Sequence, residues 1–202
     1  MIRSNSATTG SITVDEFFEQ VEDGQKADLI DGVIWMASPD SLDADDVQGF
    51  IRSLVHTYIA AKGIGGRVCG SRVAFVLNES NAPEPDLAYL TPERYAAQHG
   101  KRVKGPPDIA VEVTCEDSRS RDYEAKFRLY EQFGVQEYWI VDLENSRAEF
   151  FVLKHGRFEP LPLEDGRIYR STVIPGFWLD ARWLTESPLP NVYACQKLIL
   201  GQ

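Results

Sequence analysis

Apolar positions that recur with helical spacing mark two helices in the sequence. One stripe runs through residues 41–62 and predicts a long amphipathic helix that ends at the glycines following Lys62. Its members are Val47, Phe50, Ile51, Leu54, Val55, Tyr58 and Ile59. A second helix is predicted over 118–133, ending at Gly134. A capping-box pattern at residues 13–16 predicts a short helix to about Glu22, ended by Gly24.

Short apolar runs bounded by turn residues predict strands between these helices. Residues 28–36 are typical of a hairpin, because Asp31-Gly32 supplies the left-handed turn positions that a two-residue loop needs. Residue 67 begins a run that predicts one strand to residue 77, and Thr91-Pro92 predicts a helix start. Further strands are predicted at 86–90, 109–114, 136–142, 148–153, 157–161 and around 168.

Strands and helices mixed in this order predict an α/β (α+β) fold with a mixed sheet flanked by helices. An N-terminal hairpin and a C-terminal β-rich extension complete it, and residues 181–202 are expected to form a weakly patterned tail. A length of 202 residues suits one domain. We therefore expect a flexible N-terminus over 1–12 and a single domain over 13–202.

Charge neither supports nor excludes a nucleic-acid substrate. The formal charge is −10, whereas general nucleic-acid binders usually carry a basic face. However, residues 1–48 contain 11 acids and 2 bases, so most of the negative charge lies in that segment. The rest of the chain is close to neutral, and a phosphodiester substrate remains compatible with it.

No apolar run approaches ~18 residues, so no membrane span is expected, and the N-terminus lacks the apolar core of a signal peptide. The three cysteines, Cys69, Cys115 and Cys195, are odd in number and widely spaced. This pattern suits a reducing cytoplasm better than a disulfide framework or a zinc site. We expect a cytoplasmic protein.

Two acids begin or interrupt apolar strands. Asp86 opens the run 87–90, and Glu112 lies inside the run 109–114, where burying a carboxylate costs several kcal/mol unless a cation or donors compensate it. Strand alternation places Glu112 between the small side chains of Ala110 and Thr114, which leaves room for an ion. Mg²⁺ prefers oxygen ligands and keeps several waters, so two carboxylates could hold it. The alternative for Asp86 is that it only begins a strand after a turn, as Pro-Asp pairs often do.

Lys126, on the helix after Glu112, completes this candidate site. A lysine nearby could orient an attacking water or neutralise charge that develops on a phosphorane. From the residues alone, however, its i,i+4 spacing from Asp122 favours an ordinary solvated contact worth ~0.3–0.5 kcal/mol. Cys115 falls on the strand face opposite Glu112 and is interpreted as a core thiol rather than a nucleophile. His56 lies off the long helix's apolar stripe and is expected at the surface.

An ordered set of motifs resembles a known family. Pro85-Asp86-Leu87, Val111-Glu112-Val113 and the segment 122–126 follow one another, and 28–32 is similar to a Glu-Leu-Ile-Asp-Gly hairpin motif. The runs 134–142 and 174–177 match two further signatures. Together they resemble the Uma-type putative restriction endonuclease family of the PD-(D/E)XK nuclease superfamily.

This resemblance implies a restriction-endonuclease-like core and a metal-dependent endonuclease acting on DNA. It implies that Asp86 and Glu112 bind Mg²⁺ (or Mn²⁺), with the carbonyl of Val113 as a further ligand. The superfamily usually places its lysine two residues after the glutamate, where this chain has Thr114. The family moves that lysine to the following helix, which matches Lys126 and favours a catalytic role for it.

Two function classes remain open at this point. The first is the endonuclease, whose preference for DNA over RNA and number of metal ions the sequence does not fix; a homodimer would suit cleavage of both strands. The second is a nuclease-like fold that no longer cleaves and serves as a binding or assembly module. An unrelated hydrolase has little support, because the chain lacks a Gly-x-Ser-x-Gly frame and a glycine-rich phosphate loop.

Overall fold

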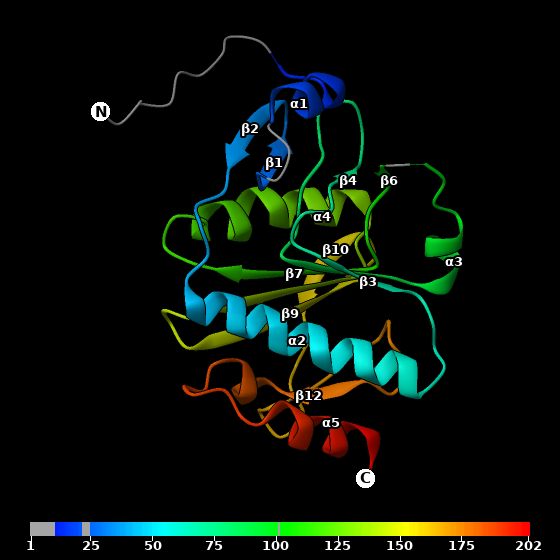
Figure 1. The fold of residues 1–202 in the computed structure, drawn as a ribbon, viewed down its shortest axis with the longest axis vertical. Coiled ribbons are helices and arrows are strands. Elements are labelled where there is room, and N and C mark those ends of the chain that lie inside the picture. Colours follow the sequence, from blue (N-terminus) through cyan, green and yellow to red (C-terminus); the bar gives the residue numbers. More distant parts are fainter. Residues whose placement is uncertain (1–10, 22–24, 101) are drawn as a thin grey trace.

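A six-stranded mixed sheet forms the centre of the protein (Figure 1). The computed structural model describes residues 11–21, 25–100 and 102–202. Within the sheet β7 and β8 are parallel, and the other neighbouring strands are antiparallel. The order across the sheet is β10 (Arg157–Pro160), β9 (Arg147–Lys154), β8 (Glu137–Asp142), β7 (Ile109–Thr114), β5 (Leu87–Leu90) and β3 (Arg67–Gly70). The predicted α/β class with a mixed sheet is confirmed.

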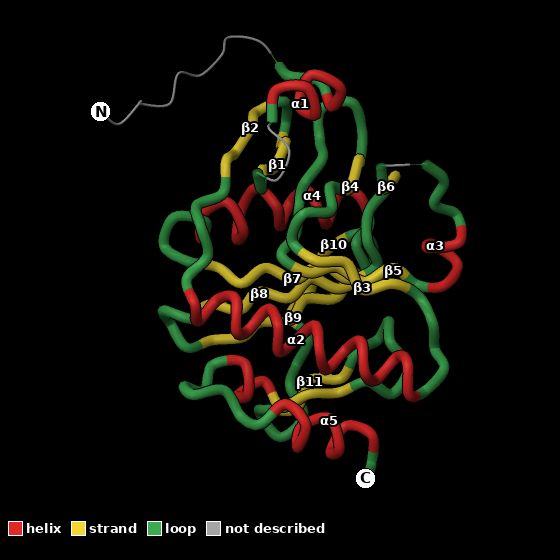
Figure 2. Tube along the Cα trace, in the orientation of Figure 1, coloured by secondary structure: helices red, strands yellow, loops and turns green. Residues whose placement is uncertain are grey.

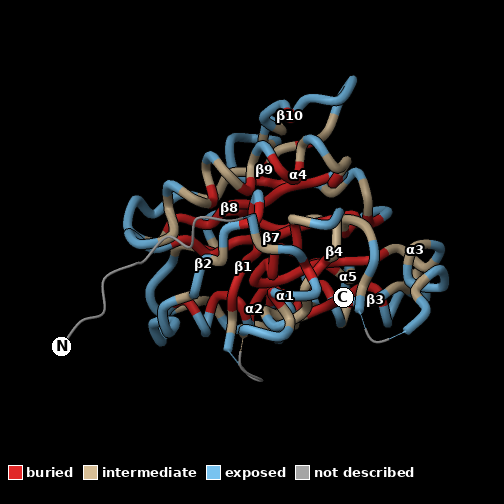
Figure 3. The backbone as a smooth tube through the Cα atoms, turned by 90° about the horizontal axis from the view of Figure 1, so that it is seen from above, coloured by how far each residue is buried: buried red, intermediate tan, exposed pale blue. Residues whose placement is uncertain are grey.

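Helices cover both faces of this sheet (Figure 2). α2 (Leu42–Ala61) packs its apolar stripe on one face, as predicted from its spacing. The π-helical segment η1 (Arg121–Lys126) and α4 (Phe127–Phe133) lie on the other. Alternation in β7 sends Val111 into the core beneath α2 and Ala110 into the smaller core beneath α4. The central strands are consequently buried from both sides, as the red tube of Figure 3 shows.

The N-terminal hairpin forms a separate layer beyond η1 and α4. Its strands are β1 (Ala27–Ile30) and β2 (Val33–Met36), and both turn residues have positive φ, 50° at Asp31 and 73° at Gly32, as predicted. α1 (Val14–Gln20) and the short parallel pair β4 (Phe75–Val76) and β6 (Val103–Lys104) lie on the same side of the sheet, and α3 (Pro92–Ala96) packs next to β5. The predicted helix end at Gly24 lies outside the described residues, as does most of the segment 1–12 that was expected to be flexible.

The C-terminal segment is more ordered than a tail. It contains β11 (Ile168–Arg170), β12 (Trp178–Asp180), the 3₁₀ turn η2 (Ala181–Leu184) and α5 (Val192–Leu200), which packs along α2. The expectation of a weakly patterned tail was therefore wrong. Asn191 caps α5 by accepting a hydrogen bond from the backbone of Ala194. The i,i+4 pair Cys195 and Ile199 supplies the buried side of that helix.

Two further boundaries differ from prediction. The strand expected over 67–77 is interrupted by a turn at residues 71–72, and its second half leaves the central sheet as β4 to pair with β6. The helix over 118–133 forms, but its first turns are π-helical, a register that sequence spacing does not reveal. None of the helices in the described part of the chain is long and apolar enough to cross a membrane.

Candidate active site

Glu112 lies at the centre of the sheet and points toward η1 and α4. Its side chain is 2 % exposed, and its Oε1 accepts a hydrogen bond from the Tyr130 hydroxyl at 3.0 Å. The same oxygen lies 3.0 Å from Nζ of Lys126. The hydrogen bond from Tyr130 and the charge of Lys126 therefore compensate the cost of burying this carboxylate in an apolar strand.

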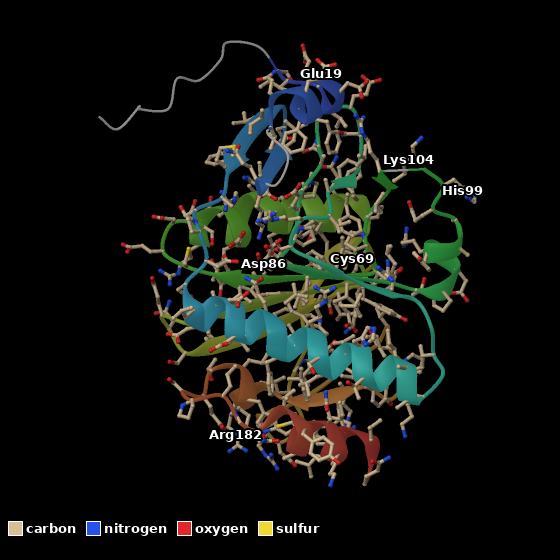
Figure 4. All side chains as sticks on the ribbon, in the orientation of Figure 1. Glu19, Cys69, Asp86, His99, Lys104 and Arg182 are labelled. Carbon is tan, nitrogen blue, oxygen red and sulfur yellow. The ribbon has the colours of Figure 1, made fainter. Side chains whose placement is uncertain are left out.

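Asp86 precedes β5, the strand that neighbours β7. Its Oδ2 accepts the backbone N–H of Val113 at 2.7 Å, which ties the loop before β5 to the strand that carries Glu112. Its other oxygen, Oδ1, is paired with Nζ of Lys26, just before β1. Figure 4 shows Asp86 near the middle of the molecule, between the hairpin and α2. Asp86 is thus held by one backbone donor and one partly exposed cation.

Lys126 ends the π-helical segment and is 1 % exposed. Besides Glu112, its ammonium lies 3.1 Å from Oδ2 of Asp28 and 3.7 Å from Oδ1 of Asp122. The wider turn of a π-helix aims Asp122 and Lys126 in nearly the same direction, and π-helical turns are frequent at functional sites. The i,i+4 contact with Asp122 exists, but it is buried, so its interpretation as a solvated pair was wrong.

The hairpin supplies a third carboxylate to this cluster. Asp28 lies in β1, a strand buried at every position, and faces Lys126. Its Oδ1 accepts the backbone N–H of Glu84 at 2.8 Å, and its Oδ2 lies 3.4 Å from Nε of Arg121. Glu84 in turn accepts the backbone N–H of Ala27 at 3.3 Å. These contacts join the hairpin, the loop before β5 and η1 around one group of charges.

The electrostatics of the cluster follow from burial and charge balance. Burial raises the pKa of Glu112 to about 8, although Lys126 opposes the shift, and it raises the pKa of Glu84 to about 7. The pKa of Asp122 is likewise raised by burial. Burial disfavours the charge of Lys126, yet the surrounding carboxylates outweigh it and raise its pKa. The lysine therefore stays charged, while some of the acids hold protons near neutral pH.

A cavity of about 210 Å³ opens beside this cluster. Asp86, Glu112, Val113 and Lys126 all line it, and the Ser38 hydroxyl donates to Asp117 at 3.3 Å from one wall to the other. Five acids and three bases line it, a formal charge of −2: Asp40, Asp86, Glu112, Asp117 and Asp122 against Lys26, Arg121 and Lys126. A phosphate would be repelled by this balance unless further positive charge joined it.

The donor set fits a hard divalent cation only in part. Among the residues that the structure describes, no group of three or more His, Cys, Asp or Glu side chains is arranged to hold a metal ion. The physical reason is that Lys26 and Lys126 lie among the carboxylates. In favour of a metal, Oδ1 of Asp122 is buried without a hydrogen-bond partner. Asp86, Glu112 and the Val113 backbone also meet at one cavity. These oxygens suit Mg²⁺, which needs few protein ligands.

The structure brings the predicted residues Asp86, Glu112 and Lys126 to the same cavity, joined by the contacts above; what each does there stays a prediction. Sequence reasoning missed Asp28, Lys26 and the buried position of Asp122. Asp28 carried the same signal as Glu112, an acid inside a buried strand. Lys26 carried no comparable signal, because its partner Asp86 is 60 residues away.

Cys115 is a correction. It was expected to be a core thiol, but it is exposed and lines the cavity. β7 ends at Thr114, so strand alternation no longer determines where the next side chain points. His56 is exposed, as predicted.

Comparison with known proteins gives a family and a similar fold. The sequence pattern of the Uma2 family, described as putative restriction endonuclease, matches residues 14–182. The fold is similar to the crystal structure of a putative nuclease belonging to DUF820 from Anabaena variabilis. The TM-score is 0.71 at 16% sequence identity, over 86% of this chain and 97% of that one. At this identity the likeness shows the fold alone. No curated protein matches the chain.

Proposed function

This chain belongs to the Uma2 family of putative restriction endonucleases, and on that premise we propose that it hydrolyses DNA phosphodiester bonds with a divalent cation, Mg²⁺ or Mn²⁺. The observation that carries the proposal is the position of Lys126 Nζ, 3.0 Å from Glu112 and buried at the cavity that Asp86 also lines. Two carboxylates and a buried lysine at one accessible cavity form a site where a phosphodiester can be bound and attacked.

Asp86, Glu112 and the carbonyl of Val113 are the residues that would hold the cation. When bound, it would supply positive charge to a phosphoryl oxygen and acidify the attacking water. The hydrogen bond from the Val113 N–H fixes Asp86 relative to β7, and Tyr130 fixes Glu112. Both carboxylates are therefore oriented before substrate arrives, which lowers the reorganisation needed during the reaction.

Lys126 is the proposed source of positive charge beside the reacting phosphate. Its raised pKa keeps the ammonium protonated across the neutral range, so it acts as a fixed donor and not as a general base. Asp28 and Asp122 hold it from two further sides. It can therefore donate a hydrogen bond to the water or to a phosphate oxygen as negative charge develops there.

Cleavage of a supercoiled plasmid in Mg²⁺ or Mn²⁺ tests the proposal. We expect wild-type protein to nick or linearise the plasmid, and Asp86→Asn or Glu112→Gln to lose at least ~10²-fold in rate. Glu124→Gln is the matched control, because Glu124 is exposed on the same helical segment as Lys126. Absence of cleavage of both duplex and single-stranded DNA by wild-type protein would overturn it.

A second candidate is a nuclease-like binding or assembly module without activity. The ion pairs of Lys26 and Lys126 favour it, since they compensate Asp86 and Glu112 without a metal. Thermal unfolding with added Mg²⁺ separates the two, because a ligand that binds only the folded state must raise the melting temperature. The endonuclease predicts a rise at millimolar Mg²⁺ that Asp86→Asn abolishes, and the module predicts none.

A further inference from the structure

Most arginines in the described part of the chain are paired with a carboxylate. Most of the unpaired arginines lie close to one strand. Within residues 11–21, 25–100 and 102–202, no carboxylate lies within 4.0 Å of Arg52, Arg67, Arg72 or Arg128. All four are exposed. The first three gather around one element, β3, in a protein whose formal charge is −10.

β3 is the edge strand of the central sheet, and it lies beside β5, the strand that Asp86 precedes. Its last residue, Gly70, pairs with Leu87, the residue that follows Asp86. A Cβ placed on Gly70 would lie 2.9 Å from Nη1 of Arg52, so the guanidinium of Arg52 lies directly over this glycine. Arg52 therefore lies on the face of the sheet that α2 covers, near the start of β5, whereas Glu112 lies on the opposite face.

A second cavity continues the first one toward Arg72. It has a volume of about 350 Å³ and shares residues 36–40 and Lys26 with the active-site cavity. Ser71 and Arg72, immediately after β3, form its other wall. The two cavities therefore share one wall, formed by Lys26 and residues 36–40, with Glu112 at the first cavity and the turn after β3 at the second. Figure 4 shows Cys69 of β3 and Asp86 at a similar height in the molecule.

We propose that the edge of β3, with Arg72 at the cavity wall, Arg52 over Gly70 on the α2 face and Arg67 at the start of the strand, binds the phosphate backbone of the DNA strand next to the cleaved bond. This inference rests on the proposed function and adds where the substrate lies. Guanidinium groups bind phosphate oxygens bidentately, and these three have no carboxylate partner to compete. Arg67 begins β3 and Arg72 lies in the turn that follows it, so these two arginines lie at opposite ends of the strand.

Exposed arginines scattered over the surface would not indicate a binding site. Arg52, Arg67 and Arg72 instead share one sheet edge, and Arg72 lines a cavity that shares a wall with the active-site cavity. The many acidic residues of segment 1–48 repel DNA. The chain therefore needs a local region of positive charge where the substrate approaches. Asp40, which lines both cavities, is the acid on their shared wall, and it accepts a hydrogen bond from Gln48 at 3.2 Å.

The test is binding of fluorescein-labelled DNA, single- and double-stranded, followed by anisotropy in Ca²⁺ at several salt concentrations. The variants are Arg72→Gln, Arg52→Gln and the double variant. Arg72 lies in an exposed turn, so its substitution should not disturb folding, which thermal melting checks. Arg128→Gln is the matched control, because Arg128 is also exposed without a carboxylate partner. Arg128 lies on α4, away from β3, and its Nε donates to the Glu124 carbonyl.

We expect each single variant to weaken DNA binding about tenfold and to reduce the slope of log K against log salt by about 0.7–0.9. Arg128→Gln should leave both unchanged. Equal affinity of wild type and Arg52→Gln/Arg72→Gln would overturn the inference, as would an equal loss in the control. Plasmid cleavage keeps the two proposals apart: a wild-type protein that cleaves while the variants bind normally refutes this surface and leaves the nuclease intact.

Discussion

Replacing Lys126 by methionine tests whether this lysine compensates the buried acids. Methionine keeps an apolar stem of similar length and removes the ammonium, which lies within 3.7 Å of Asp28, Glu112 and Asp122. Removal of one partner from a buried ion pair costs about 3–5 kcal/mol of folding stability. The structure places the expected loss at the lower end, about 3 kcal/mol, for reasons that concern each acid separately.

Glu112 loses only part of its stabilisation, because its raised pKa of about 8 means that about half of the molecules still hold its proton at pH 8. Asp28 retains the Glu84 N–H and the nearby Arg121. Asp122 keeps the side chain of Ser118 and the charge of Arg121, but its Oδ1 lacks a hydrogen-bond partner even in the wild type. The cost is therefore concentrated on Asp122 and on the part of Asp28 that Arg121 does not neutralise.

The assay is urea unfolding of wild type and Lys126→Met in EDTA at pH 8 and pH 5. Without the lysine, the pKa values of the acids rise further in the folded state. An acid whose pKa is higher folded than unfolded loses stability as pH rises between the two values, so the variant should be closest to wild type at pH 5. Lys154→Met is the control, since Lys154 pairs with Glu159 at 3.3 Å on the surface, where such pairs contribute ~0–1 kcal/mol. A loss below about 1 kcal/mol at pH 8, or a gap independent of pH, would refute the reasoning.

Three further outcomes are expected. Lys26→Met removes the cation that pairs with Oδ1 of Asp86, so Mg²⁺ should bind about three- to tenfold more tightly. The Mg²⁺ dependence of the melting temperature measures this affinity, and an unchanged affinity would show that Lys26 does not compete with the metal. Glu84 has a pKa raised by burial to about 7, so wild type loses stability as pH rises from about 4.5 to 7. Glu84→Gln keeps an acceptor for Ala27 and should be more stable than wild type by about 1–2 kcal/mol at pH 8 and equal at pH 5 in urea unfolding, and the reverse order contradicts the shift. Glu137→Gln should lower the free energy of unfolding by about 2–4 kcal/mol in the same assay, because Ser171, Thr172 and Val173 all donate to that carboxylate and an amide nitrogen would face them. The Mg²⁺ affinity of this variant should equal that of the wild type.

Sequence reasoning could predict those parts of the fold that depend on local spacing. The stripe of α2 and the Asp31-Gly32 turn are encoded in consecutive residues, and both formed as expected. α5 was also encoded, by the Asn191 cap and the Cys195–Ile199 spacing, but the short pattern was missed. The π-helical register of η1 could not be predicted, because its residues Asp122 and Lys126 are buried against charges from other elements.

The candidate site shows the same division. Glu112 was recognisable because an acid inside an apolar strand needs a partner, and Asp28 met the same criterion within β1. The partners themselves were not recognisable, since Lys26 reaches Asp86 across 60 residues and Lys126 reaches Asp28 from a different layer. A sequence can therefore indicate which charge requires compensation, but only the tertiary fold determines which residue provides it.

The charge balance of the cavity links the proposals. A fold that buries Asp28, Asp86, Glu112 and Asp122 together would be unstable if their charges were uncompensated, and Lys26 and Lys126 remove that penalty without a metal. The two lysines differ, however: Lys126 is enclosed, whereas the side chain of Lys26 is 19% exposed and faces one acid at the cavity wall. Lys26 can therefore leave Asp86 when a cation arrives, while Lys126 stays. Its release would add a positive charge to the cavity that Arg72 lines, where the substrate strand is proposed to lie.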